Sequence, residues 1–379
     1  MSPVSRHRVG RWLRGLSLSC LVLFIATPMA MASEIPEYGI SWIRELGFNR
    51  VLVPRHAEQR STPLVVSDTI HLGTRLGDVW SFDRRRGTVN WSVRLGSPVD
   101  ADLSVDRNHL YAATVSGAVY ALDRESGSTQ WRYWAGHEVQ GAPTVAGELL
   151  LFTTANNQLF ALDRHTGVWQ WQYSEGPDPD LSIRGVAGVA VSENAAFTGF
   201  SNGVLVRVGL DDGRPIWRQR LDATGQFQDI DATPVLADGR LYVVVYGSRL
   251  VAVDPEDGDL LWSSAVSSHE SPIVIEGRVY LGGLDGSVHA FDAATGESQW
   301  TRRVSDEPLV TPVYHHGRLY VADARRGLVV LDRDSGVILW RYQGAVSGVR
   351  AAPAVDARGG IYLATNLGHL YRFHPIRSR

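Results

Sequence analysis

Residues 159–171 read LFALDRHTGVWQW, and this stretch contains the unit from which the fold can be worked out. Its first four residues are apolar, which is typical of a strand that is buried on both faces. Asp163 follows, and its side chain can accept hydrogen bonds from the backbone two residues on and so start a turn. Gly167 supplies the positive φ of a tight reversal, and Trp171 then brings a large indole onto the returning strand. The stretch predicts a hairpin between a buried and an outer strand.

The same order of apolar run, Asp, Gly and Trp recurs along most of the chain. Successive tryptophans of the unit are 40, 40, 46, 45, 38 and 40 residues apart. A period near 40 is the length of a four-stranded propeller blade. A further tryptophan, in GISWIRELG at residues 39–47, aligns with TVNWSVRLG at residues 88–96. We interpret the repeat tryptophans as packing residues between neighbouring blades: Trp42, Trp91, Trp131, Trp171, Trp217, Trp262, Trp300 and Trp340.

The count of strands predicts how the ring closes. Seven complete units lie between residues 61 and 345, and three more apolar strands follow between Ala352 and His374 without a tryptophan. The strand around Trp42 would complete that last blade and remove a free sheet edge. The sequence therefore predicts an all-β, eight-bladed β-propeller of four-stranded antiparallel blades, closed by the N-terminal strand. Seven blades with an unpaired tail are the alternative.

The first 32 residues have the pattern of a secretory signal peptide. Four arginines precede an apolar stretch from Gly15 to Thr27, and Ala30-Met31-Ala32 matches the small-x-small cleavage pattern. Residues 33–379 would then form a single propeller domain. A transmembrane anchor is the rival interpretation, although the apolar run is short for a bilayer span. Lipidation at Cys20 is a second rival, although Ser17 stands where a lipobox has a leucine-like residue.

Composition argues against several classes of function. Without the four arginines of the leader, 33 basic residues face 40 acidic ones, and a net charge of −7 disfavours nucleic acid as a partner. Lysine is absent, so Schiff-base chemistry and a Walker-type phosphate loop are excluded. The only cysteine, Cys20, lies in the leader. We expect no catalytic residue, no metal site and no cofactor.

The repeat is interrupted at two consecutive places. The two longest tryptophan intervals hold the segments 174–188 and 221–234, each between the outer strand of one blade and the inner strand of the next. Both connections are of the same kind, so we expect them on one face of the ring. With LSIRG at 181–185 and QDIDATP at 228–234, the chain resembles the BamB family, the propeller subunits of the outer-membrane β-barrel assembly machinery.

The resemblance implies a partner and a set of docking residues. In that family the matching positions dock onto a periplasmic POTRA domain of the barrel-inserting subunit, and unfolded outer membrane proteins are further expected clients. The positions carried over are Leu181, Ile183, Arg184, Asp229 and Asp231. The apolar pair alternates with Ser182 and so could face one way, and an arginine adds a planar fork for an interface. The alternative is that the apolar pair tucks under its own loop while the arginine pairs with Asp229.

The resemblance also implies a location in the periplasm, associated peripherally with the outer membrane. Members of the family are usually lipoproteins, and the leader here departs from that pattern, so the lipid anchor stays open. The repeat leaves two other functions open. The repeat is similar to that of pyrroloquinoline-quinone dehydrogenases, which would imply adjacent cysteines and a calcium site that this chain does not offer. A periplasmic propeller that senses a small ligand is the third possibility.

Overall fold

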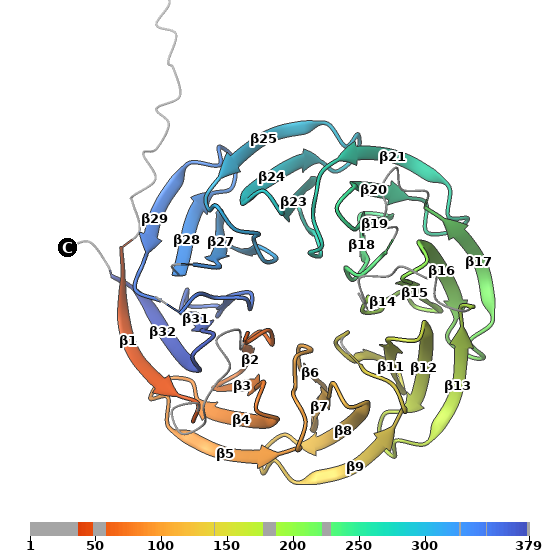
Figure 1. Cartoon of the computed structure of the whole chain (residues 1–379), viewed down its shortest axis with the longest axis horizontal. Coiled ribbons are helices and arrows are strands. Elements are labelled where there is room, and N and C mark those ends of the chain that lie inside the picture. The colour runs from red at the N-terminus through yellow and green to blue at the C-terminus, as the bar shows by residue number, and fades with distance from the viewer. Residues whose placement is uncertain are drawn as a thin grey trace, which may run out of the picture. The chain divides into compact units, whose positions relative to one another are not determined.

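The computed structural model describes residues 37–47, 58–139, 141–176, 187–221, 229–325, 327–345 and 347–376. In these residues all regular structure is β-strand, and the strands form eight sheets of four. Within the compact unit Ile35–Arg379 the sheets follow one another around a ring (Figure 1). The predicted eight-bladed β-propeller is confirmed. The predicted leader, residues 1–32, lies outside the described residues.

Blades 1 to 4 are continuous in the chain, and each runs from its innermost strand (a) outward through b and c to its outermost strand (d). Blade 1 comprises β2 (Leu64–Val66), β3 (Thr69–Gly73), β4 (Asp78–Asp83) and β5 (Val89–Arg94). Blade 2 comprises β6 (Ser104–Val105), β7 (His109–Ala113), β8 (Ala118–Asp123) and β9 (Thr129–Trp134). Blade 3 comprises β10 (Thr144–Ala146), β11 (Leu149–Thr154), β12 (Gln158–Asp163) and β13 (Trp169–Ser174). Blade 4 comprises β14 (Ala190–Val191), β15 (Ala195–Gly199), β16 (Val204–Gly209) and β17 (Pro215–Arg220).

Blades 5 to 7 repeat this order, and blade 8 departs from it. Blade 5 comprises β18 (Val235–Ala237), β19 (Arg240–Val245), β20 (Arg249–Val253) and β21 (Leu260–Ala265). Blade 6 comprises β22 (Ile273–Ile275), β23 (Arg278–Gly282), β24 (Ser287–Asp292) and β25 (Ser298–Arg303). Blade 7 comprises β26 (Val313–His315), β27 (Arg318–Asp323), β28 (Gly327–Asp332) and β29 (Ile338–Tyr342). Blade 8 comprises β30 (Ala354–Val355), β31 (Ile361–Ala364), β32 (His369–Ile376) and, from the other end of the chain, β1 (Glu37–Glu45).

The first strand of the chain closes the ring. β1 pairs antiparallel with β32, with Glu37 opposite Ile376 and Trp42 opposite Arg372. In Figure 1, β1 lies outside β32 at the rim, in the position that the d strand takes in every other blade. The predicted closure is confirmed, and the seven-bladed alternative with an unpaired tail is wrong.

The repeat motif acts across the boundary between blades as well as within a hairpin. Asp163 accepts hydrogen bonds from the backbone N–H groups of His165 (3.0 Å) and Thr166 (2.8 Å), which fixes the predicted turn. Gly167 has φ +71°, as that turn requires. A Cβ built on this glycine would lie 2.6 Å from the ring of Trp131 in the preceding blade. Glycine is therefore needed for the indole to pack as well as for the chain to reverse.

In the described structure, seven of the eight repeat indoles also donate a hydrogen bond to the next blade. The indole N–H of Trp131 donates to the carbonyl of Arg164 (3.0 Å), and that of Trp171 donates to the carbonyl of Leu210 (2.7 Å). The same bond runs from Trp42 of blade 8 to Arg85 of blade 1 (3.1 Å), so it spans the closure of the ring. These three indoles therefore lie at boundaries between blades.

The core is divided among the boundaries between blades. Eight clusters of buried apolar side chains occur in the described residues, and each draws on two neighbouring blades. Tyr111 of blade 2 and Phe152 of blade 3, both fully buried, belong to one such cluster. Burial of one such side chain stabilises the fold by about 1.5–3 kcal/mol.

The antiparallel order gives the ring two different faces. The connections from strand d to the next strand a and the b–c turns lie on one face, which we call the connection face. The a–b and c–d turns lie on the other, the turn face. Prolines directly precede six of the inner strands on the connection face, where no N–H is needed for the ladder: Pro63, Pro143, Pro234, Pro272, Pro312 and Pro353. The described residues contain no helix long and apolar enough to cross a membrane.

Candidate docking face

Two long connections leave the ring on the connection face. The first runs from the end of β13 to the start of β14, and the second from the end of β17 to the start of β18. Both join an outer strand to the next inner strand, so they share a face and are separated by blade 4. Parts of both, residues 177–186 and 222–228, lie outside the described residues. Leu181, Ile183 and Arg184 are among them, and their docking role stays a prediction.

The described end of the second connection packs against blade 4. The N–H of Ile230 donates to the carbonyl of Phe200 (3.1 Å), and the N–H of Tyr246 donates to the carbonyl of Asp229 (2.9 Å). Ile230 occupies the space beside Gly199, where a Cβ would come within 2.1 Å of it. Asp229 is fully buried and Asp231 is partly exposed, so of the two predicted carboxylates Asp231 is the one that reaches the surface.

Asp231 opens into a cavity of about 650 Å³ formed where the inner strands begin. Burial raises the pKa of Asp231 to about 7, and the neighbouring carboxylates of Asp229 and Glu270 add to this effect. Burial also raises the pKa of Asp100, which lines the same cavity. The titratable residues that line it are Glu58, Arg60, Asp100, Asp102, Asp231, Tyr246, His269, Glu270 and Arg350.

The charges in this cavity are only partly compensated. Glu58 forms ion pairs with Arg60 (3.0 Å) and Arg350 (3.6 Å). The Oδ1 atoms of Asp100 and Asp231 are buried without a hydrogen-bond partner. No group of three His, Cys, Asp or Glu side chains suited to a metal ion occurs in the described part of the chain. The excess of carboxylates gives the cavity a negative potential, which favours a positively charged group.

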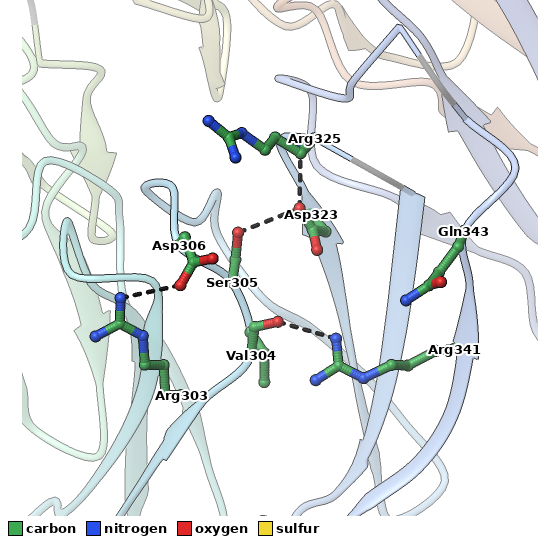
Figure 2. Close-up of a pocket in the computed structure, with 8 residues that line it drawn as sticks. All are labelled: Arg303, Val304, Ser305, Asp306, Asp323, Arg325, Arg341 and Gln343. Atoms are coloured by element: carbon green, nitrogen blue, oxygen red, sulfur yellow. Dashed lines mark hydrogen bonds and ion pairs between the residues drawn. The ribbon is translucent and has the colours of Figure 1, made fainter.

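A second cavity, of about 330 Å³, lies between blades 6 and 7 on the same face (Figure 2). Asp323 lines this cavity, and its side chain accepts hydrogen bonds from the hydroxyl of Ser305 (3.2 Å) and the backbone N–H of Arg325 (2.9 Å). The guanidinium of Arg341 donates to the carbonyl of Val304 (2.9 Å). The bonds from Ser305 to Asp323 and from Arg341 to Val304 cross the boundary between the two blades, so we interpret the cavity as part of the packing of blades 6 and 7.

Sequence reasoning missed one buried charge at the root of the first connection. Glu175 follows β13 directly, and its side chain is only 4% exposed. It pairs with Arg218 on β17, which is the strand that leads into the second connection. A signal for it was available, because four residues after the repeat tryptophan the other blades carry Leu46, Leu95, Ala135, Leu221, Val266, Val304 and Gly344. Only blade 3 has a charge at this position.

A protein-family profile matches most of the chain, over a range that includes both connections. The profile of the family described as "Outer membrane protein assembly factor BamB" matches residues 75–302 and 284–375. The BamB protein of Yersinia pestis is 30% identical over 202 residues, covering 52% of this chain and 51% of that protein. The BamB protein of Escherichia coli K12 is 28% identical over 200 residues, covering 51% of each. The chain thus spans about half the length of the curated relatives it matches.

Solved structures share the fold over a larger part of the chain. BamB from Moraxella catarrhalis superposes with a TM-score of 0.76 at 22% identity, covering 89% of this chain and all of that one. Quinohemoprotein alcohol dehydrogenase from Comamonas testosteroni superposes with a TM-score of 0.69 at 14% identity, covering 90% and 77% of the two chains. At these identities the likeness establishes the propeller fold alone.

Proposed function

The chain belongs to the family of outer membrane protein assembly factors named BamB, and from that premise we propose that it is a non-catalytic scaffold for the assembly of outer membrane β-barrel proteins. A ring held by repeated packing leaves the irregular connections free to bind a partner. Its place would be the periplasm, peripherally associated with the outer membrane, and unfolded outer membrane proteins would be its clients.

The partner that we propose is a POTRA domain of the barrel-inserting subunit. The observation that carries the proposal is that the two irregular connections leave neighbouring blade boundaries on one face, with Asp231 at the described end of one of them. Leu181, Ile183 and Arg184 would supply the apolar and cationic contacts from the other connection. Asp229, being buried, would support the segment from below, and Asp231 would meet a cation of the partner.

The test is a binding measurement between the chain from residue 33 onward and purified POTRA domains of the same organism. Replacing Leu181 and Arg184 together by alanine should weaken binding by more than about tenfold, because interface energy is concentrated in a few apolar and arginine side chains. The melting temperature should stay unchanged. Equal affinity of the variant and the wild type would overturn the docking assignment.

The control is a double variant of the same kind on the turn face. Two exposed residues lie there: Leu260 is 53% exposed, and the side chain of Arg214 is 85% exposed. Replacing these two by alanine removes the same types of side chain far from the connections. We expect wild-type affinity from this variant. A loss equal to that of the connection variant would mean that the two connections are not the docking surface.

A second candidate function, binding of a small ligand, is favoured by the 650 Å³ cavity at the start of the inner strands. Its carboxylates would select a cationic compound. A screen of cationic metabolites by thermal shift tests it, with Asp231→Asn as the matched variant. If no compound raises the melting temperature of the wild type by more than it raises that of the variant, the cavity has no such ligand.

A further inference from the structure

Glu175 places a buried carboxylate at a position where the propeller fold does not require a charge. The other blades fill the equivalent place with apolar side chains or glycine, and Leu46 and Leu221 at this place are 1% and 4% exposed. Burying a carboxylate costs free energy unless it is fully paired, and an apolar residue would serve the packing better. The charge therefore calls for a role beyond packing.

Glu175 is bound from three elements. Its Oε2 accepts hydrogen bonds from Nε of Arg218 (3.0 Å) and from the hydroxyl of Tyr173 (2.6 Å). Its Oε1 accepts from the other guanidinium nitrogen of Arg218 and from the side-chain amide of Asn202 (3.3 Å). The donors lie on β17, on β13 and in the b–c turn of blade 4. The fork of the arginine holds both carboxylate oxygens, which fixes the relative orientation of the two outer strands.

The electrostatics agree with a permanent ion pair. Burial by itself would raise the pKa of Glu175, but the hydrogen bonds from Arg218, Tyr173 and Asn202 outweigh it and the pKa is lowered. Burial and the bond to Glu175 raise the pKa of Tyr173 to about 12. At neutral pH the carboxylate is therefore ionised, and the tyrosine is a neutral donor to it.

The pair lies where both irregular connections begin. Glu175 is one residue before the last described position ahead of 177–186, and Arg218 is on the strand that ends just before 222–228. We propose that Glu175 and Arg218 form a clasp that fixes the spacing between the two connections, and so positions them for one partner. The inference rests on the proposed docking function, and it makes both residues positioning residues.

The decisive variant is Glu175→Leu, which restores the apolar side chain of the other blades. Arg218 has a 53% exposed side chain, so the variant leaves no buried charge without a partner. We expect an unchanged or higher melting temperature, together with a loss of POTRA affinity of roughly five- to tenfold. The reversed pair, Glu175→Arg with Arg218→Glu, should recover part of that affinity if it folds. A stable Glu175→Leu protein that binds like the wild type would overturn the proposal.

Hydrogen exchange of the free protein gives a readout that needs no partner. In Glu175→Leu we expect faster exchange in peptides that cover residues 171–176 and 216–221, where the two connections begin, and no change in peptides from blades 6 and 7. Unchanged exchange in both connections would also overturn the clasp. If the wild type fails to bind POTRA domains, the proposed function fails, while this measurement still decides whether the clasp positions the connections.

A matched control is the ion pair between Arg278 of blade 6 and Asp334 of blade 7 (2.5 Å). It also joins neighbouring blades, but it lies on the turn face. Arg278→Leu should leave both POTRA affinity and exchange in the two connections at wild-type values. An equal effect from this variant would mean that any contact between blades tunes docking, and the specific assignment to Glu175 and Arg218 would be wrong.

Discussion

The indole of Trp171 packs so closely against Gly213 of the next blade that a Cβ on that glycine would lie 2.4 Å from the ring. The same relationship joins Trp131 to Gly167 and Trp91 to Gly127. The glycine of the repeat therefore has two roles: it forms the turn of its own hairpin, and it contacts the tryptophan of the preceding blade. In the described structure this contact occurs at seven of the eight boundaries between blades, beside the apolar cluster of each boundary.

Replacing Gly213 by alanine should destabilise the protein through two effects. The residue has φ +68°, which costs an L-residue about 1–2 kcal/mol, and the added methyl group must displace the indole, which costs about 1–3 kcal/mol more. Chemical denaturation measures the sum. Gly239→Ala is the control, because Gly239 has φ +71° and nothing within 4 Å of a built Cβ. Equal losses from the two variants would mean that contact with the indole contributes nothing.

The ion pair between Arg84 of blade 1 and Asp356 of blade 8 (2.9 Å) should stabilise the closure of the ring. Both side chains are nearly buried, and Asp356 also accepts a hydrogen bond from the hydroxyl of Tyr362 (2.8 Å). Asp356→Asn should lower the free energy of unfolding by about 2–4 kcal/mol, because it leaves a buried guanidinium undercompensated. Asp334→Asn, in a pair whose carboxylate is largely exposed, should cost less than about 1 kcal/mol.

The contribution of Asp356 should depend on pH. Burial alone would raise the pKa of Asp356, but its hydrogen bonds and the nearby Arg84 lower it. A lowered folded-state pKa stabilises the protein above the pKa of the unfolded carboxyl and ceases to do so as pH falls through the folded value. The difference between wild type and Asp356→Asn should therefore shrink below about pH 4. A difference that grows on acidification would contradict the assignment.

Asp231 should show the opposite dependence. Its pKa is raised to about 7, so the folded protein binds a proton that the unfolded chain has released. The resulting cost is absent below about pH 4 and complete above about pH 7. Asp231→Asn should then stabilise the free protein by roughly 1–4 kcal/mol at about pH 8, and by little at about pH 4. Thermal melts across this range measure it, and a variant less stable at the higher pH would contradict the prediction.

Removing the first strand should open the ring. A chain that begins at residue 58 lacks β1, which leaves the backbone of β32 unpaired along its outer edge. We expect this chain to associate with itself and to lose a single cooperative unfolding transition, as judged by light scattering and calorimetry. Addition of a peptide of residues 37–47 should reduce the association. A monomeric truncated chain that melts like the full one would show that closure by β1 is not needed.

Much of the fold follows from the sequence because the repeat is local. Asp163, Gly167 and Trp171 stand within one hairpin, and their spacing alone predicts its strands and turn. The closure was also predictable, since the segment around Trp42 matches the repeat out of order. What the repeat could not indicate is the contact between Gly213 and Trp171, because it forms across two blades.

The candidate site was less accessible to sequence reasoning. The position of Asp231 beside the inner-strand cavity depends on the ring bringing the starts of many inner strands together, which no local pattern contains. Burial of Asp229 likewise follows from its packing against blade 4. The unusual charge of Glu175 can be found in the sequence, because an alignment of the blades has no other charged residue at this position. Its pairing with Arg218 can be seen only in the structure.

The eighth blade joins one strand that is synthesised early, β1, to three that are synthesised late, β30, β31 and β32. The side chains of Ser41 on β1 and His374 on β32 are joined by a hydrogen bond, although the two residues are 333 positions apart in the chain. During synthesis β1 therefore has no strand to pair with until β32 has been made. A chain that ends before β32 lacks the strand with which β1 pairs, so its ring cannot close in this way.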